Sequence, residues 1–198
     1  MEENYFEKYF TKIYNNIANI HNAFYIWRGL NKKEYTKIYN ENKYFWGIVL
    51  VSLQLDWLLE IAKVFEVPKE GKEVVSIPFI LGFVPEGEKK EEIKKEIDKQ
   101  KLILDNLWQW RCKILVHQDK IVVDNTADFY KEYPIKGGEI ENLLDSIKHI
   151  LGLIKSSKAD HSESYSFKIF EEESEKDDEQ IIQKLEYFNR ERKNTWEN

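Results

Sequence analysis

The chain has 198 residues, of which 42% are hydrophobic and 33% are charged, and its formal net charge is −6. A chain of this length holds one domain, or one domain with an appendage, and buries a core large enough to fold without disulfides. The acidic balance gives no basis for a general attraction of the whole chain to nucleic acid, so a nucleic-acid role requires a local site.

The single cysteine, Cys112, excludes an internal disulfide and a zinc site built from cysteine pairs, and it fits a reducing compartment. Residues 1–5 lack the basic start and apolar run of a signal peptide. We therefore expect a cytoplasmic protein that is not exported.

A long amphipathic helix is predicted over about residues 4–30, followed by a short helix within residues 32–39. Apolar residues recur in the first helix at alternating spacings of four and three, which places them on one face. They are Phe6, Phe10, Ile13, Ile17, Ile20, Phe24 and Trp27.

The second long helix is predicted over about residues 41–66. It is apolar nearly all round, which is typical of a helix covered by neighbours on most sides. Its most apolar window, residues 44–55, is shorter than the roughly 20 residues of a membrane span, so we expect a buried helix and no membrane. Ser52, Asp56, Glu60 and Lys63 form a narrow polar stripe, read as a solvated edge with a Glu60–Lys63 pair; a catalytic role for Asp56 or Glu60 is the alternative.

Ser76 is predicted to cap a short helix that reaches residue 84. No helix breaker follows from residue 88 to about residue 117, which predicts one helix of about 45 Å with a Glu91–Lys95 pair on its solvated half. Residues 124–138 are predicted to be a loop. Its Tyr130 and Tyr133 either cap the end of the bundle or stack on a base.

The period of three and four returns over residues 140–156 and predicts another amphipathic helix. A polar linker is expected at residues 158–166 and a last helix at about residues 178–192. The predicted class is all-α: an antiparallel bundle of four to five long helices with a C-terminal helical appendage. Residues 1–157 would form the bundle, and residues 158–198 would pack on it or on a second subunit.

The candidate metal ligands do not cluster in the sequence, because His21, His117, His149 and His161 are scattered. We expect no metal and no cofactor, since phosphate-loop and nucleophile-elbow motifs are also absent. Cys112 with His117 as its base would make a nucleophile, but a lone helical cysteine in an apolar stretch is typical of core packing.

Arg111 is the residue that departs from the packing pattern. One face of this predicted helix carries Ile93, Ile97, Leu104 and Leu107, and Arg111 is the next residue on that face. A guanidinium on such a face requires a partner, because it stays charged and is rarely buried alone. The candidates are Asp56 or Glu60, carbonyl groups at a helix end, or a phosphate.

His117 follows Arg111 after five intervening residues, about 120° away around an ideal α-helix. The two side chains would meet where the helix unwinds or across a two-fold axis. A histidine beside a fixed positive charge has the groups needed for metal-free phosphodiester cleavage.

This spacing, at the end of a late helix in an all-α bundle, resembles the Arg and His motif of the HEPN superfamily. The wider pattern from Trp110 to Lys120, preceded by residues 21–30 and the helix of residues 44–65, is most similar to the abortive-infection branch.

The resemblance implies a homodimer in which two copies of the motif face one another. Active members are metal-independent endoribonucleases, often toxins restrained by an antitoxin protein or deployed against phage. Arg111 would contact the phosphate of the RNA and His117 would act as general acid and base, with Asp119 orienting His117.

Cys112 is the supporting position that departs from the family, because active members commonly carry a polar residue after the arginine. Some members have lost activity and only bind. The alternative is therefore a non-catalytic RNA- or protein-binding module in which Arg111 is a structural buried ion.

Overall fold

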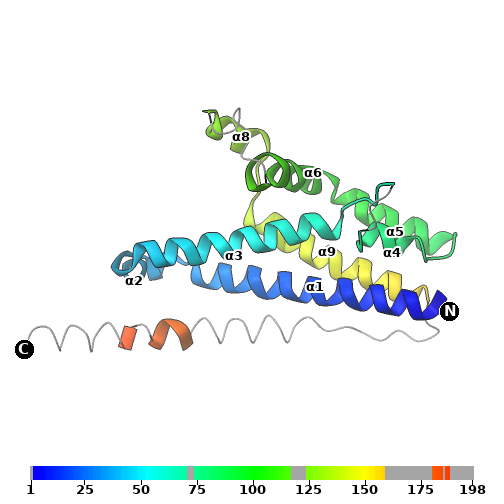
Figure 1. Cartoon of the computed structure of the whole chain (residues 1–198), viewed down its shortest axis with the longest axis horizontal. Helices are drawn as coiled ribbons and strands as arrows, with labels where there is room; N and C mark the ends of the chain where they lie inside the picture. Colours follow the sequence, from blue (N-terminus) through cyan, green and yellow to red (C-terminus); the bar gives the residue numbers. More distant parts are fainter. Residues whose placement is uncertain (1, 71–73, 117–123, 159–179, 185, 188–198) are drawn as a thin grey trace, which may run out of the picture. The chain divides into compact units, whose positions relative to one another are not determined.

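The computed structural model describes residues 2–70, 74–116, 124–158, 180–184 and 186–187. Regular structure in these ranges is helical throughout, with no strand, so the predicted all-α class is confirmed (Figure 1). The antiparallel bundle arrangement stays a prediction.

The elements follow in chain order as α1 (Glu2–Leu30), η1 (Lys33–Tyr35), α2 (Thr36–Glu41), α3 (Lys43–Val64), α4 (Ile77–Leu81), α5 (Glu88–Lys99), α6 (Lys101–Trp110), η2 (Arg111–Val116), α8 (Thr126–Glu132) and α9 (Gly137–Ser156). Residues 180–184 and 186–187 are also helical, within the last predicted helix.

Several local predictions are confirmed. The predicted face of α1 is buried from Phe6 to Phe24, and the predicted face of α9 is buried from Ile140 to Ile154. Ser76 caps α4, since its Oγ accepts a hydrogen bond of 3.3 Å from the backbone N–H of Phe79.

The continuous helix expected over residues 88–117 is wrong. The chain turns at Gln100, with φ −93° and ψ 1°, and divides the run into α5 and α6. The side-chain amide of Gln100 donates to Ser146 Oγ of α9 at 2.9 Å, and both α5 and α6 contact α9. The turn thus lets two short helices pack on one long helix. The expected Glu91–Lys95 pair is also wrong, because Glu91 pairs with Lys94 at 2.6 Å.

The loop expected over residues 124–138 contains the helix α8. Phe129 is buried, and its ring lies 6.0 Å from that of Trp110 on α6. Seven residues are too few to form a helix by propensity alone, so this contact accounts for a helix that periodicity did not reveal.

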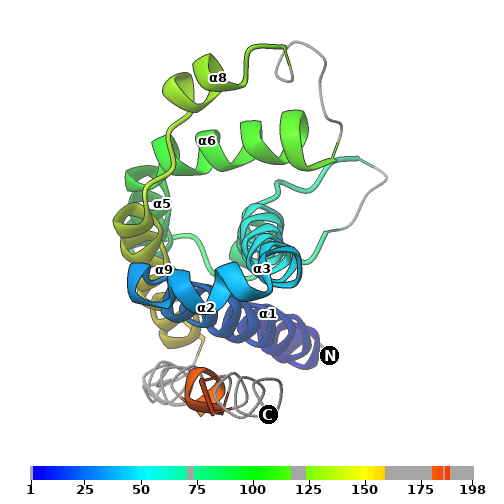
Figure 2. The ribbon, with the colours of Figure 1, turned by 90° about the vertical axis from the view of Figure 1, so that its left-hand side faces the viewer.

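The chain divides into two compact units: Met1–Ile17 with Leu58–Ser166, and Ala18–Trp57 with the described residues that follow Phe167. In the first unit α5 and α9 lie side by side (Figure 2). Lys155 of α9 also pairs with Glu7 at the start of α1, at 2.6 Å. The predicted division at residues 157 and 158 stays a prediction, because residues 159–179 and 188–198 lie outside the described ranges.

The second unit has its own core of four buried residues, packed against further partly buried side chains of α1, α2 and α3. The four are Leu30, Ile38, Trp46 and Ile182. Here the expectation of a covered α3 is wrong, because only 28% of its most apolar 18-residue window is buried. By length and composition alone, α3 also qualifies as a helix that could cross a membrane, although no membrane is present in the structure.

Candidate functional site

Arg111 stands where α6 changes into a π-helix. The α-helix ends at Trp110, and residues 111–116 form the π-helical turn η2, in which hydrogen bonds run from residue i to residue i+5. Such turns occur often at functional sites. The 120° offset between Arg111 and His117 assumed an ideal α-helix, so it does not apply to this segment.

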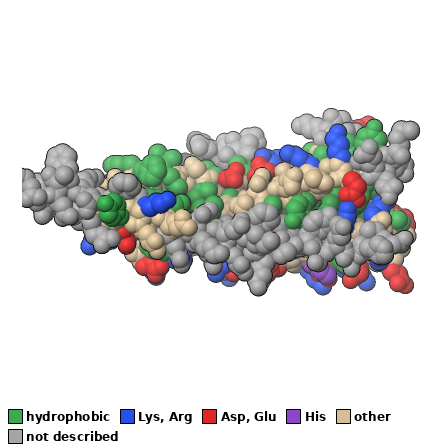
Figure 3. Space-filling view, turned by 90° about the horizontal axis from the view of Figure 1, so that it is seen from below, with side chains coloured by type: hydrophobic (Ala, Val, Ile, Leu, Met, Phe, Trp, Pro, Cys, Tyr) green, Lys and Arg blue, Asp and Glu red, His purple; other side chains and the backbone are tan. Residues whose placement is uncertain are grey.

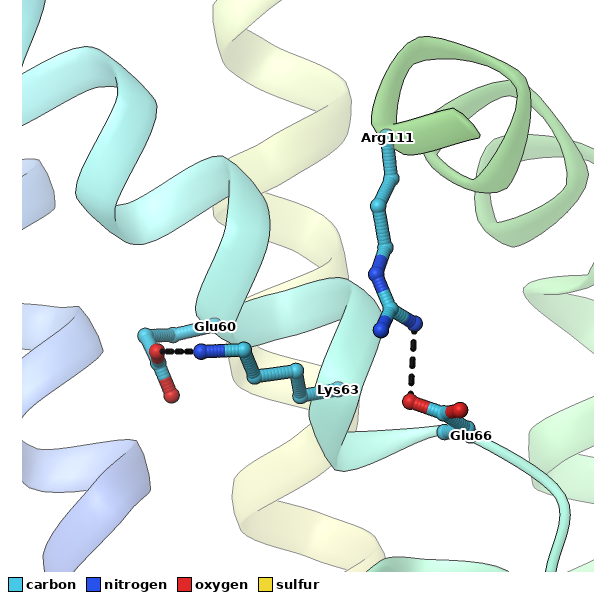
Figure 4. Close-up of polar contacts among 4 residues, drawn as sticks. All are labelled: Glu60, Lys63, Glu66 and Arg111. Carbon is cyan, nitrogen blue, oxygen red and sulfur yellow. Dashed lines mark hydrogen bonds and ion pairs between the residues drawn. The ribbon is translucent and has the colours of Figure 1, made fainter. Parts of the chain in front are cut away.

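The partner of Arg111 is Glu66, a carboxylate that sequence reasoning missed. Arg111 Nη1 donates to Glu66 Oε2 at 2.8 Å, and the two side chains are 20% and 22% exposed (Figure 4). Glu66 follows the end of α3, where its N–H donates to the carbonyl of Lys63 at 3.1 Å. Of the partners considered for Arg111 from the sequence, Glu60 pairs with Lys63 instead, as the spacing predicted.

A signal for Glu66 was present in the polar stripe of α3. The stripe ends at Lys63. Glu66 lies three residues further on, a spacing that would place it on the same face of a continued helix. The sequence did not lead to Glu66 as a partner of Arg111, because the stripe was interpreted as a solvated edge.

Trp108 forms the second contact of Arg111. The guanidinium carbon lies 4.9 Å from the centroid of the Trp108 ring, a cation–π geometry. Leu104 and Trp108 of α6 thus continue into Arg111 of η2 as one partly exposed face, whereas the buried face of α6 carries Ile103, Asn106 and Leu107. The break at Gln100 separates this face from Ile93, and Leu104 and Trp108 line a cavity.

That cavity is a pocket of about 380 Å³ in the first unit. Glu66 and Trp108, the two contacts of Arg111, both lie in its wall. The other lining residues are Ala62, Phe65, Val67, Lys69, Pro78, Ile97, Asp98, Lys101, Leu104 and Asp105. The lining is therefore mostly apolar but includes charged residues of both signs.

The remaining predicted site residues are only partly placed. Cys112 is half-buried and carries a free thiol. His117 and Asp119 lie outside the described residues. Within the described ranges, no three His, Cys, Asp or Glu side chains come together in a way that would hold a metal ion.

Tyr130 of α8 and Tyr133, the residue after α8, pack on Trp110 of α6. The Tyr130 ring stacks on Trp110 at 5.1 Å, and the Trp110 indole N–H donates to the carbonyl of Tyr133 at 2.7 Å. A hydrogen bond to the Glu132 carboxylate raises the pKa of the Tyr133 hydroxyl above its ordinary value. In this arrangement the tyrosines hold the end of α6, which favours the capping interpretation over base stacking.

Comparisons with protein-family models, curated proteins and solved structures find no match. The functional argument therefore rests on the residues of this chain. On the described part of the face shown in Figure 3, acidic and basic side chains are interspersed, which matches the mixed charges of the sequence.

Proposed function

We propose that the chain is a metal-independent endoribonuclease of the HEPN type, active as a cytoplasmic homodimer in a toxin–antitoxin or phage-defence role. Arg111 binds the phosphate of the RNA, and His117 acts as general acid and base. Asp119 orients His117, Cys112 supports the site, and an antitoxin protein is the expected restraining partner.

The observation that carries this proposal is the half-buried guanidinium of Arg111, at the first residue of the π-turn that runs toward His117 in the sequence. One hydrogen bond joins it to Glu66, whereas a phosphate accepts two from a guanidinium. An RNA phosphate would replace Glu66 as the partner of Arg111 and would accept two hydrogen bonds from the guanidinium instead of one. The pair thus keeps the arginine partnered until substrate binds.

The reaction follows from these two groups. His117 takes the proton of a ribose 2′-hydroxyl, and the oxygen attacks the adjacent phosphorus. The bond from phosphorus to the 5′-oxygen breaks, and that oxygen leaves with a proton from an imidazolium. Arg111 stabilises the negative charge that develops on the phosphoryl oxygens.

The test is cleavage of labelled structured and unstructured RNA by the purified full chain in EDTA. We expect His117→Ala to lower the rate by about 10²–10⁴-fold, the usual contribution of a general acid and base. Arg28→Ala removes an exposed arginine of α1 and serves as a control that should keep full activity. Equal cleavage by wild type and His117→Ala, or none by the wild type, would refute the proposal.

A second candidate is a non-catalytic RNA- or protein-binding module. The Arg111–Glu66 pair favours it, because the charge of Arg111 is already neutralised within the chain. This candidate predicts no cleavage in EDTA or in Mg²⁺, together with a loss of thermal stability in Arg111→Ala.

A further inference from the structure

The pocket next to the Arg111–Glu66 pair has the size of a small-molecule site. Its volume of about 380 Å³ lies within the range of ligand pockets, and its whole lining belongs to the first compact unit. The guanidinium of Arg111 contacts two residues of the wall, Glu66 at 2.8 Å (Figure 4) and the ring of Trp108 at 4.9 Å. A ligand in the pocket therefore lies next to the group proposed to bind phosphate.

One side of α6 supplies a large part of the wall. Lys101, Leu104, Asp105 and Trp108 all line the pocket, and their separations of three, one and three residues place them on the same side of the helix. Phe65, which follows the end of α3, adds a second aromatic side chain. Trp108 is 36% exposed although it contacts a guanidinium. Such a ring in an apolar pocket is a stacking surface for a flat heterocycle.

The lining carries no net charge once the Arg111–Glu66 pair is set aside. Two lysines are balanced by two aspartates, and these four residues are Lys69, Lys101, Asp98 and Asp105. None of the four makes a hydrogen bond or an ion pair within the described part of the chain, so their polar groups are available to a ligand. A neutral ligand that carries both donors and acceptors fits this lining better than an anion or a cation does.

A nucleobase combines these properties, because it is flat, neutral and able to form hydrogen bonds along its edge. Asp105 lies three residues before Trp108, so its carboxylate is next to the stacking surface. An ionised carboxylate only accepts hydrogen bonds, and the ammonium group of Lys101, four residues earlier, only donates them. Together they are complementary to an amino group beside a ring nitrogen that accepts, as in cytosine and adenine. Uracil has a carbonyl oxygen in place of the amino group.

We infer that this pocket binds a base that carries an amino group, cytosine or adenine. Trp108 is the stacking surface, Asp105 accepts a hydrogen bond from the amino group, and Lys101 donates one to the ring nitrogen. The inference rests on the proposed function, since the base belongs to the nucleotide whose phosphate meets Arg111. It adds the substrate class, which is single-stranded RNA, because a base stacked and paired in a duplex does not enter a pocket.

The test compares 3′-CMP with 3′-UMP, which differ only at this edge of the base. The full chain is titrated with each nucleotide and followed by NMR of its nitrogen-15-labelled indole N–H groups, with the signal of Trp108 identified by its loss in Trp108→Phe. We expect that signal to shift, and 3′-CMP to bind about 5–30-fold more tightly than 3′-UMP, the discrimination of a good base contact. Neither nucleotide contains a bond that the proposed enzyme cleaves, so the result does not depend on catalysis.

Three variants assign the ratio of the two affinities to the pocket. Asp105→Asn keeps the shape of the side chain but lets it donate as well as accept, so the two nucleotides should bind equally within about twofold. Asp56→Asn is the control, because Asp56 is also an exposed aspartate of a helix but lies outside the pocket lining, and it should keep the ratio. Arg111→Ala should weaken both nucleotides by the same factor and leave the ratio unchanged.

Equal binding of the two nucleotides, binding of neither at about 10 mM, or a ratio that Asp105→Asn does not change would overturn the inference. A preference for 3′-CMP that Asp105→Asn removes, in a chain that cleaves no RNA in EDTA, would refute the proposed activity and support the base pocket. Cleavage of RNA in EDTA together with equal binding of the two nucleotides would keep the activity and overturn the base pocket.

Discussion

Replacing Glu66 with Gln separates the two interpretations of Arg111. The substitution keeps the shape of the side chain and removes the charge that the guanidinium meets at 2.8 Å. If Arg111 is only a structural ion, the variant loses stability and nothing else. If Arg111 binds phosphate, the variant also removes the carboxylate that competes with RNA.

The expected loss of stability lies between two limits. An exposed ion pair contributes about 0–1 kcal/mol, and a buried hydrogen bond to a charged group about 1.5–3 kcal/mol. The side chains of Arg111 and Glu66 are 20% and 22% exposed, which lies between the exposed and the buried case. We therefore expect the free energy of unfolding to fall by roughly 1–2 kcal/mol. For a chain of this size that lowers Tm by about 2–8 °C.

The expected gain in RNA affinity comes from the removed repulsion between Glu66 and the phosphate. A gain of roughly 1 kcal/mol corresponds to about fivefold tighter binding. Thermal unfolding and RNA titration at fixed salt measure the two effects on the same samples. Glu60→Gln is the control, because Glu60 lies near the end of α3, shortly before Glu66 in the chain, and pairs with the half-exposed Lys63 (Figure 4). Loss of stability with RNA affinity unchanged in both Glu66→Gln and Arg111→Ala would refute phosphate binding by Arg111.

Three further predictions concern the fold. Leu144→Ala should cost about 2–5 kcal/mol, because Leu144 is fully buried in α9, whereas Leu102→Ala, at 77% exposure, should leave the midpoint of urea unfolding nearly unchanged. Asn106→Ala should cost about 1–3 kcal/mol in the same assay, since its amide donates at 2.9 Å to a backbone carbonyl that follows α8. Hydrogen bonds from lysines lower the pKa of Glu86 and Glu96 below the ordinary 4.5, so their contribution to stability is present above pH 4.5 and is lost as pH falls through the lowered values. The free energy of unfolding of Glu86→Gln/Glu96→Gln should therefore fall less than that of the wild type between about pH 5 and pH 3, measured by urea unfolding.

The long helices were predictable because their patterns are local. The faces of α1 and α9 repeat over several turns, and a repeat of that length leaves no other period consistent with it. Gln100 shows where this reasoning ends. Glutamine is a good helix former, and the turn there accompanies a contact with Ser146, which lies 46 residues away in the chain. The residues around Gln100 alone do not predict such a contact.

The same argument applies to Arg111 and to the exposed apolar residues of α3, such as Ile48 and Val51. A guanidinium among apolar residues requires an anion, and an apolar face requires a cover, so sequence identifies both needs. The group that pairs with the guanidinium or covers the apolar face lies elsewhere, so the neighbouring residues do not identify it. For Arg111 it is Glu66, which lies 45 residues away in the same chain. For Ile48 and Val51, which are 70% and 53% exposed, the described part of the chain supplies no cover. The apolar pattern of α3 therefore shows that a cover is required but does not say which group supplies it.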